Sequence, residues 1–500
     1  MKPHILEVGD QLGIVLQDVS EGSLLLDGVT AVQDISRNHK VALKDIPAGS
    51  VVRKFGQPIG VAQCDIDAGS WVHVHNLGFS TDLGALGQGT ESELSGDVIP
   101  ERRTFMGFRR ANGKVGTRNY VGIIASVNCS ATVCRAIASR AERAFADRFP
   151  DIDGFVPITH DSGCGIAMSG EPFEILQRTI NGYIQHPNFA GVVLVGLGCE
   201  VNQIKNYAMS EAVKDKRLSL NIQDAGGTSE TIKSALGLIE EMCINISASE
   251  QREEVSVEHL VLGLQCGGSD GLSGITANPA LGRATDYLVA AGGTAILSET
   301  PEIFGAESLL ISRSSSDVAD QLRACLDWWL KHSEQNQVSL DNNPSPGNKA
   351  GGLTTILEKS LGAVSKAGAT PLRAFYKYAE TVKQAGLVFM DTPGYDPVSA
   401  TGQVAGGANV VAFTTGRGSC FGSRPAPCIK LASSTDLYRR MQDDMDIDCG
   451  QIISAATPMD EMGLQIYHRL LDVASGEKSK SEELGYGDNE FVPWRFGAVL

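Results

Sequence analysis

Short apolar runs alternate with longer helical stretches over most of this chain, and this alternation constrains the fold more than any other feature. The runs are rich in β-branched residues and end at polar residues or glycine. They are YVGIIASV (120–127), GFVPITH (154–160), AGVVLVGLG (190–198), HLVLGLQ (259–265), GLVFMDTP (386–393), ANVVAFTTG (408–416) and CIKLA (428–432). Helical stretches such as 131–149 and 230–246 lie between them. Alternating strands and helices predict an α/β fold with helices covering a parallel sheet.

The N-terminal part has a different character. Two similar units, IPAGSVV (46–52) and IDAGSWV (66–72), each combine an Ala-Gly turn with a strand-like run, which predicts a small all-β module. A chain of 500 residues is also too long for one hydrophobic core. We therefore expect four parts: an all-β module (1–77), a linker rich in Gly, Ser and acidic residues (78–104), a first α/β lobe (105–250) and a second α/β lobe (251–500).

Composition narrows the class of partner. The net charge of −17 argues against nucleic acid and against an anionic membrane surface, whereas local arginines or a metal would still permit an anionic small substrate. The first residues form no apolar signal segment and no run approaches the ~18 apolar residues of a membrane span, so we expect a cytoplasmic protein. The 11 cysteines are then reduced thiols, some of them metal ligands.

Four of the predicted strands end in a cysteine: Cys129, Cys164, Cys199 and Cys266. The carboxyl ends of parallel strands share one edge of a sheet, so these thiols are predicted to converge on a metal. Thiolates suit iron, an iron–sulfur cluster or another soft metal. The alternative is that each cysteine is a small apolar residue of the core.

Histidines are the candidates for proton transfer. His73 and His75 in SWVHVHN would face the same side of a strand, and His39 lies in the same module. His160 follows a strand and is a further candidate base. A structural role is the alternative for each of these histidines.

Polar loops supply candidate substrate ligands. Arg417 lies between two glycines after a strand, where a guanidinium suits a carboxylate clamp, and Lys349 lies in the long loop 333–352. The glycine-rich loop after Cys266 offers hydroxyl-binding groups in Ser269, Asp270 and Asn278. GLGCEVN (196–202) lacks the third glycine of a dinucleotide fingerprint, which argues against an NAD-linked oxidoreductase.

Long motifs in this chain resemble the altronate and galactarate dehydratases. They are RRANGKVGTRN (109–119), THDSGCG (159–165), VGLGCE (195–200), QCGGSDGLSGITANPALGR (265–283), NPSPGNKAGGL (343–353), EKSLG (358–362), FTTGRG (413–418) and DIDCGQI (446–452). The N-terminal module resembles the SAF domain of those enzymes. The resemblance implies loss of water from a sugar acid to give a 2-keto-3-deoxy acid, with a divalent metal as cofactor. Arg118, in the first motif, is a further predicted substrate ligand.

The resemblance leaves the substrate open. ETPEIFGAESLL (299–310) is closer to the altronate enzymes, whereas DWWLKH (327–332) is closer to the galactarate enzymes. Asp161 and Ser162 stand where either group would have Thr-Tyr. The related sulfolactate sulfo-lyase divides the two parts between subunits, so their union in one chain favours a sugar-acid dehydratase. A sulfo-lyase, another hydroxy-acid lyase and a non-catalytic sugar-acid binding protein are the alternatives.

These residues together give a hypothesis for the mechanism. The four cysteines hold iron, as Fe²⁺ or an iron–sulfur cluster, with Mn²⁺ as the alternative ion. His73 and His75 transfer protons, with His160 as the fallback. A rival arrangement places the metal on His73 and His75 and leaves the thiols structural. We expect a small-molecule sugar acid as partner, and the sequence leaves open whether the chain forms a homo-oligomer.

Overall fold

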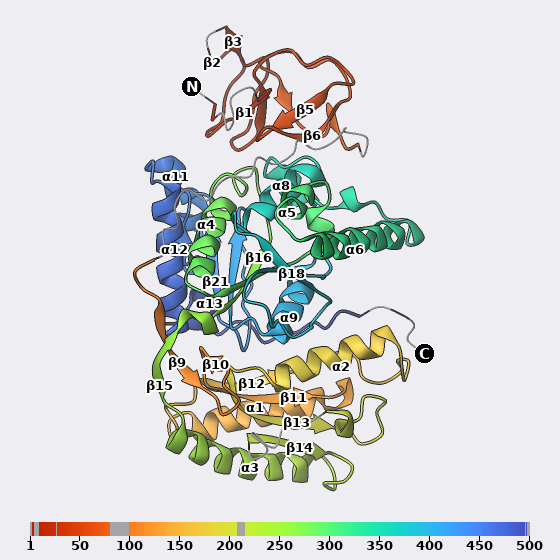
Figure 1. The fold of residues 1–500 in the computed structure, drawn as a ribbon, viewed down its shortest axis with the longest axis vertical. Coiled ribbons are helices and arrows are strands. Elements are labelled where there is room, and N and C mark those ends of the chain that lie inside the picture. Colours follow the sequence, from red (N-terminus) through yellow and green to blue (C-terminus); the bar gives the residue numbers. More distant parts are fainter. Residues whose placement is uncertain are drawn as a thin grey trace.

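The computed structural model describes residues 3–4, 10–26, 28–80, 100–207, 216–495 and 497. Along the long axis of the molecule the N-terminal module comes first, the second lobe lies in the middle and the first lobe lies at the far end (Figure 1). The α/β class with an all-β N-terminal module is confirmed. Most of the predicted linker falls outside the described residues, and the predicted domain boundaries stay predictions.

The N-terminal module consists of short antiparallel strands. It contains the sheets β1-β4-β7 and β5-β6-β8 and the hairpin β2-β3. Its strands are β1 (Leu12–Ile14), β2 (Leu24–Leu26), β3 (Val29–Thr30), β4 (Lys40–Ala42), β5 (Val51–Lys54), β6 (Gln57–Ala62), β7 (Trp71–Val72) and β8 (Leu77–Gly78). Ile46 and Ile66, the first residues of the two sequence units, are buried and pair with each other in a β-bridge. The repeated units thus build one small core together.

The first lobe is a parallel sheet of four strands in the order β12-β11-β13-β14. Its elements are β11 (Tyr120–Ala125), β12 (Gly154–Ile158), β13 (Phe189–Gly196), β14 (Arg217–Asn221), α1 (Ala131–Phe145), α2 (Glu171–Ile184) and α3 (Thr228–Ser249). Every residue of β11 and β13 is buried, as expected for strands covered on both faces. Helices α1 and α3 pack together against the sheet, and α2 lies between this sheet and α9 of the second lobe (Figure 1).

The second lobe is a parallel sheet of seven strands in the order β18-β19-β17-β16-β20-β21-β22. Its strands are β16 (Val261–Cys266), β17 (Thr294–Leu297), β18 (Leu372–Tyr376), β19 (Gly386–Met390), β20 (Val410–Thr415), β21 (Cys428–Ala432) and β22 (Ile447–Asp448). Its helices are α4 (Ala277–Ala290), α5 (Ser308–Ile311), α6 (Ser316–Gln335), α7 (Pro346–Ala350), α8 (Ile356–Ser365), α9 (Asp396–Gly406), α10 (Thr435–Arg440), α11 (Gln451–Ser454), α12 (Met459–Ala474) and α13 (Lys480–Glu483). In Figure 1 the strand β21 points toward the N-terminal module, so the carboxyl edge of this parallel sheet faces that module.

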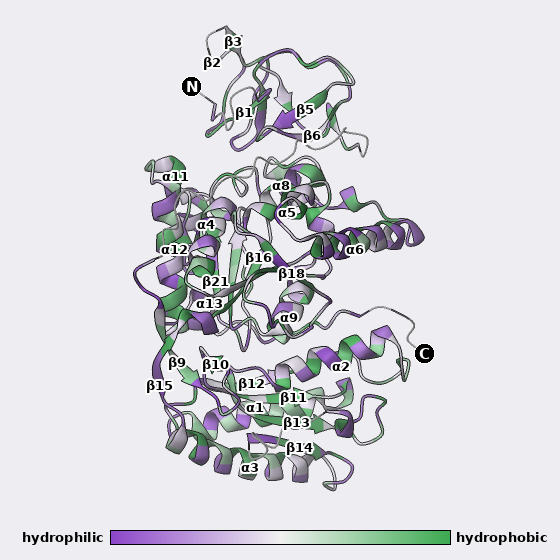
Figure 2. Ribbon diagram, viewed as in Figure 1, coloured by the Kyte–Doolittle hydropathy of each residue, from purple (hydrophilic) through white to green (hydrophobic). Residues whose placement is uncertain are grey.

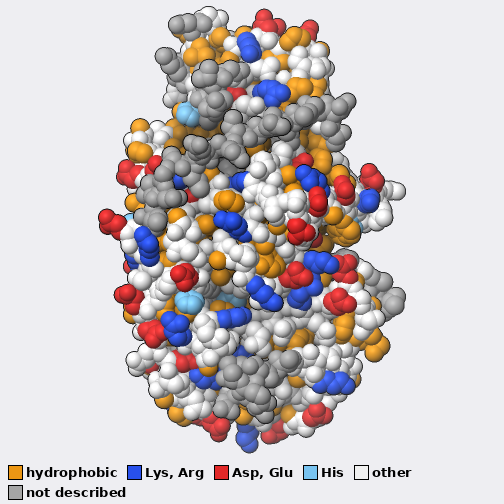
Figure 3. Space-filling view, viewed as in Figure 1, with side chains coloured by type: hydrophobic (Ala, Val, Ile, Leu, Met, Phe, Trp, Pro, Cys, Tyr) orange, Lys and Arg blue, Asp and Glu red, His pale blue; other side chains and the backbone are white. Residues whose placement is uncertain are grey.

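A small antiparallel sheet joins the two lobes. It is formed by β9 (Thr104–Arg109), β10 (Val115–Gly116) and β15 (Arg252–Ser256), and it brings the start of the first lobe next to its end. Hydrophobic residues concentrate on the sheet strands, while hydrophilic residues lie along the projecting helix α6 (Figure 2). Acidic and basic side chains are interspersed on the face shown in Figure 3. Among the helices of the described residues, none is long and apolar enough to cross a bilayer.

Candidate active site

Titratable side chains gather at the carboxyl edge of the seven-stranded sheet. Cys266 is the last residue of β16, and Glu299 follows the neighbouring strand β17 by two residues. Glu302 lies in the short 3-10 helix after β17, and Asp396 begins the helix after β19, which pairs with β17. Parallel neighbours place their carboxyl ends together, so these four acidic groups lie at one edge.

Two lysines neutralise this edge: Lys359 in helix α8, and Lys366 directly after the last residue of that helix. Lys366 Nζ lies 3.0 Å from Cys266 Sγ and 3.5 Å from a carboxylate oxygen of Glu299. Lys359 Nζ lies 2.5 Å from Glu302, which also accepts a 2.7 Å hydrogen bond from Asn343. Residues seven apart on a helix share one face, so α8 directs both ammonium groups into the cluster.

Burial and mutual repulsion shift the acid–base chemistry of the cluster. Burial raises the pKa of the Cys266 thiol to about 11, although Lys366 opposes the shift. Burial and the charge of Glu302 raise the pKa of Asp396 to about 7 and that of Glu299 well above its usual value. Burial by itself would lower the pKa of Lys366, but Cys266 and Glu299 raise it, so this ammonium stays charged. With a pKa of about 7, Asp396 exchanges a proton near neutral pH.

The donor set of this edge fits a divalent metal. Ligand atoms of Cys266, Glu299 and Glu302 lie within 4.8 Å of one another, and no other such trio of His, Cys, Asp or Glu exists among the described residues. Neither carboxylate oxygen of buried Glu299 accepts a hydrogen bond. The backbone of Glu299 has φ of 69°, and this left-handed conformation costs a non-glycine residue of the order of 1 kcal/mol or more. One sulfur and two carboxylates suit a first-row transition metal, and three protein ligands leave positions open.

The predicted hydroxyl ligands lie beside this cluster. Ser269, Asp270 and Asn278 line one small cavity together with Lys359 and with Lys54 of the N-terminal module. Asp270 accepts hydrogen bonds from Ser273 and Ser433, and Asn278 bonds to Thr414 and to the carbonyl of Gly362. The structure therefore brings the three residues together, although much of their hydrogen-bonding capacity is used within the protein. Their role as substrate ligands stays a prediction.

Histidines of the N-terminal module dock on the loop that holds α7. His73 Nε2 lies 2.9 Å from the carbonyl of Lys349, and His39 Nε2 lies 3.3 Å from that of Ala350. Trp71 donates a 3.0 Å hydrogen bond to His39 Nδ1, and the His39 and His73 ring centroids are 5.2 Å apart. Burial lowers the pKa of His73 to about 4 and also lowers that of His39. Both imidazoles are therefore neutral and engaged in docking.

The expectation that His73 and His75 face the same side of a strand is wrong. Strand β7 ends at Val72, because Asn76 closes a turn: it accepts the His73 N–H and donates its own N–H to the His73 carbonyl. The turn leaves His73 buried and His75 exposed. Their predicted catalytic role is not tested by this geometry and stays a prediction.

A buried charge triad fixes the N-terminal module over α8. Lys40 and Lys54 of the module lie 2.8 and 2.7 Å from Glu358, the residue before Lys359. All three side chains are at most 2% exposed. Burial alone would raise the pKa of Glu358, but the two lysines hold it well below its usual range. The module thus fixes the helix that carries the two site lysines.

The predicted carboxylate ligands lie at the same edge. Arg417, exposed after β20, donates its backbone N–H to Gly268 at 2.7 Å, and its side chain passes close to Gly351. Lys349 is half-buried, and its carbonyl accepts from His73. Both residues therefore flank the glycine loop that follows Cys266, and their binding role stays a prediction.

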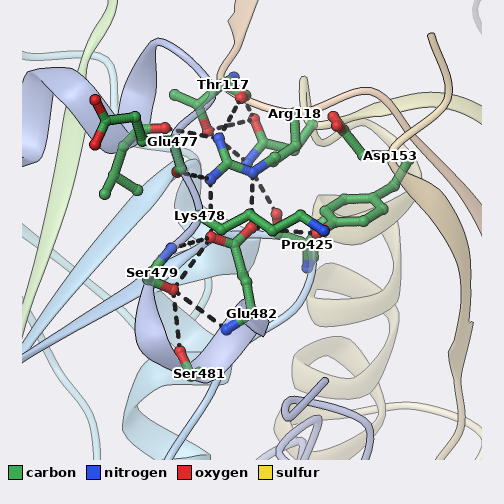
Figure 4. Close-up of polar contacts among 12 residues, drawn as sticks. Thr117, Arg118, Asp153, Pro425, Glu477, Lys478, Ser479, Ser481 and Glu482 are labelled. Carbon is green, nitrogen blue, oxygen red and sulfur yellow. Dashed lines mark hydrogen bonds and ion pairs between the residues drawn. The ribbon is translucent and has the colours of Figure 1, made fainter. Parts of the chain in front are cut away.

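Arg118 and His160 lie in the first lobe and serve the packing there. All five N–H groups of Arg118 are used: two bond to Glu482 and three to the carbonyls of Thr117, Val473 and Glu477 (Figure 4). His160 Nε2 lies 3.0 Å from the Ala125 carbonyl, and its Nδ1 accepts the Ser162 N–H. Burial lowers the pKa of His160 to about 4. Arg118 clamps the two lobes, and the substrate and catalytic roles predicted for these residues stay predictions.

The structure does not bring the four predicted cysteine ligands into one cluster. Cys266 is buried in the second lobe, whereas Cys129, Cys164 and Cys199 are exposed in the first lobe. Local sequence does not assign strands to separate sheets, so the four strand-end thiols were predicted to form one set. The sequence-based prediction missed Glu299, Glu302, Lys359, Lys366 and Asp396, four of which lie in or next to the motifs 299–310 and 358–362.

Comparisons with known proteins agree with this architecture. Sequence models of three families match: D-galactarate/Altronate dehydratase, C-terminal (257–499), D-galactarate dehydratase/Altronate hydrolase, second domain (107–247), and the Altronate/galactarate dehydratase SAF domain (4–80). The altronate dehydratase of Bacillus subtilis (strain 168) is 34% identical, covering 98% of both chains. That of Escherichia coli (strain K12) is 34% identical, covering 100% of this chain and 99% of its own. The galactarate dehydratase (L-threo-forming) of Escherichia coli (strain K12) is 36% identical, covering 94% and 92%. With such identity over nearly its whole length, the chain belongs to the altronate/galactarate dehydratase family of hydro-lyases.

Proposed function

We propose that this chain removes water from a sugar acid of the altronate or galactarate type and releases a 2-keto-3-deoxy acid. The observation that carries the proposal is the cluster at the edge of the seven-stranded sheet. It combines a carboxyl group whose pKa burial and Glu302 raise to about 7 with the ammonium groups of Lys359 and Lys366. Family membership supports the reaction type.

The chemistry required is proton transfer next to a carboxylate. The C2 proton of a 2,3-dihydroxy acid is a very weak acid, so its removal needs a base and a stabiliser of the enediolate. Asp396, ionised above its raised pKa and only partly buried, accepts this proton. Lys359 and Lys366 stabilise the negative charge that moves onto the substrate carboxylate.

The same proton completes the elimination. As the C3–O bond breaks, Asp396 returns the proton to the departing hydroxide, and water leaves. The enol product then tautomerises to the 2-keto acid. Proton transfer by a positioned side chain contributes about 10²–10⁴-fold to the rate, and its efficiency is highest when the pKa lies near the working pH.

A divalent metal completes this site in our proposal. Cys266, Glu299 and Glu302 would hold it, with iron as the expected metal and Mn²⁺ as the alternative. Such an ion supplies Lewis acidity to a substrate carboxylate or hydroxyl, worth several kcal/mol. Ser269, Asp270 and Asn278 line the adjoining cavity and would orient hydroxyl groups. Arg417, close to Gly268 and Gly351, and Lys349 would bind a carboxylate.

The test is the variant Asp396→Asn, assayed anaerobically with iron and a panel of aldonates and aldarates for 2-keto acid product. We expect activity to fall by about 10²-fold or more. The matched control is Asp446→Asn, because burial also raises the pKa of Asp446 but this carboxylate lies against Lys430 and Arg469. An Asp396→Asn enzyme with wild-type turnover would remove Asp396 from the mechanism.

The same panel separates the alternatives. A sulfo-lyase would release sulfite from a sulfonated hydroxy acid and leave the sugar acids unchanged. A binding protein would show a higher melting temperature with a sugar acid and no 2-keto product. Either result would replace the proposed dehydration.

A further inference from the structure

Three cysteines of the first lobe lie at one edge of its sheet and are not used by the proposed reaction. Strands β12, β11 and β13 are parallel neighbours, and each is followed within six residues by a cysteine. Cys164 follows β12, Cys129 follows the central strand β11, and Cys199 follows β13. All three are free and exposed. Adjacent strands lie about 4.8 Å apart, so the three loops begin within about 10 Å of one another.

Hydrogen bonds tie these loops together beside each thiol. The N–H of Asn128, next to Cys129, donates to the Ser162 carbonyl at 2.9 Å. The N–H of Asn202 donates to the carbonyl of Gly163, next to Cys164, at 3.0 Å. Ser126 donates to the carboxylate of Glu200, next to Cys199, at 2.7 Å. The cysteines are therefore presented by three loops held in fixed register.

The loops approach one another closely, and one of the thiols accepts a hydrogen bond from a side chain. Gly163 has φ of 100°, and a Cβ added there would lie 2.6 Å from the Ser126 carbonyl oxygen. Gln223 Nε2 donates to Cys199 Sγ at 3.4 Å. Cys129 lies in the turn that leads directly into α1. The loops therefore approach one another closely, and a side-chain N–H faces the Cys199 sulfur.

Geometry selects the kind of metal group. At least one pair of these sulfur atoms lies more than 4.8 Å apart, because the three do not form a trio within that distance. A single iron or zinc ion binds thiolate sulfur at about 2.3 Å, so two of its sulfur ligands cannot be more than about 4.6 Å apart. A cluster holds each thiolate on a different iron and spans a wider gap.

We propose that Cys129, Cys164 and Cys199 hold an iron–sulfur cluster in the first lobe, separate from the centre at Cys266. Three thiolates on a four-iron cluster leave one iron without a cysteine. That iron would take a small oxygen ligand, such as water or a hydroxy acid. This inference does not depend on the proposed role of Asp396.

The test uses the full chain reconstituted anaerobically with iron and sulfide. We expect about four sulfide ions per chain, about four iron ions in addition to any ion held at Cys266, and a broad absorbance near 400 nm. Cys129→Ser, Cys164→Ser and Cys199→Ser should each lower both contents severalfold. Cys64→Ser, at an exposed cysteine of the N-terminal module, should retain both contents. Cys266→Ser should retain the sulfide and the absorbance, because only the separate ion proposed at Cys266 depends on that thiol.

Three results would overturn the proposal: no sulfide-containing chromophore in the wild type, full retention in the triple variant, or equal loss in Cys266→Ser. Iron bound without sulfide and lost in the triple variant would also overturn it, because the three cysteines would then hold iron in another form. The Asp396→Asn variant separates the two proposals, since it should lose turnover and keep the chromophore.

Discussion

Replacing Glu358 by Gln should undock the N-terminal module from helix α8. Glu358 lies between Lys40 and Lys54 at 2.8 and 2.7 Å, and it also accepts hydrogen bonds from the Thr354 N–H and hydroxyl. Glutamine keeps the size and one carbonyl acceptor but removes the charge. Two ammonium groups that are 0% and 2% exposed would then lack a counter-ion.

The magnitude follows from this burial. Removing one partner of a buried ion pair costs about 3–5 kcal/mol, because the remaining charge stays desolvated. The exposed pair of Arg148 and Glu240 has a similar 2.6 Å contact but side chains 54% and 39% exposed. Pairs of that kind contribute about 0–1 kcal/mol, so Glu240→Gln is the matched control.

Urea denaturation followed by tryptophan fluorescence measures this difference, and Trp71 lies in the docking interface itself. We expect Glu358→Gln to lower the free energy of unfolding by about 3–5 kcal/mol and Glu240→Gln by less than about 1 kcal/mol. The pKa of Glu358 is depressed in the folded state, so its contribution is full above about pH 4.5 and is lost as the pH falls further. Equal losses in the two variants at pH 7 would refute the reasoning.

Three further predictions concern the sites. Lys366→Met removes the ammonium 3.0 Å from Cys266, and kcat of the folded variant should fall by about 10²–10³-fold. An unchanged kcat would remove Lys366 from the chemistry. Cys266→Ser should weaken binding of a divalent ion by at least about tenfold, measured by metal analysis after dialysis, and wild-type metal content would leave this thiol structural. In Arg118→Lys, the lysine cannot form the bidentate contact that Arg118 makes with Glu482, so the free energy of unfolding should fall by about 3–5 kcal/mol. A loss of kcat/KM at unchanged stability would instead support a substrate role.

Strand positions were predictable because they depend on local sequence. The run 428–432 coincides with β21, and the runs 120–127 and 154–160 contain β11 and β12. Every residue of β11 and β21 is buried, so the continuous apolar run of each strand matches burial on both faces of the sheet. The helical stretch 131–149 likewise contains α1.

The site was predictable only in part, because it depends on which strands are neighbours. The prediction for Cys266 identified the correct edge of the sheet. Glu299 and Asp396 lie at the same edge because β19, β17 and β16 are neighbouring strands, and no local sequence pattern reveals that order. Lys366 faces Cys266 because α8 crosses that edge, a packing relation set by Glu358 and the N-terminal module. His73 and His75 do not share a face because the Asn76 side chain accepts the His73 N–H and closes a turn there. The alternating pattern of SWVHVHN predicted a continuous strand and gave no sign of this turn.

The pH dependence of kcat/KM, compared between wild type and Asp396→Asn, tests the central claim most directly. A base must be ionised to accept the C2 proton, and the pKa of Asp396 is raised to about 7. We expect wild-type kcat/KM to fall about tenfold per pH unit below pH 7, and this limb to be absent from the residual activity of Asp396→Asn. A wild-type profile that is flat from about pH 5 to 8, or the same limb in both enzymes, would contradict the assignment of Asp396 as the proton-transfer residue.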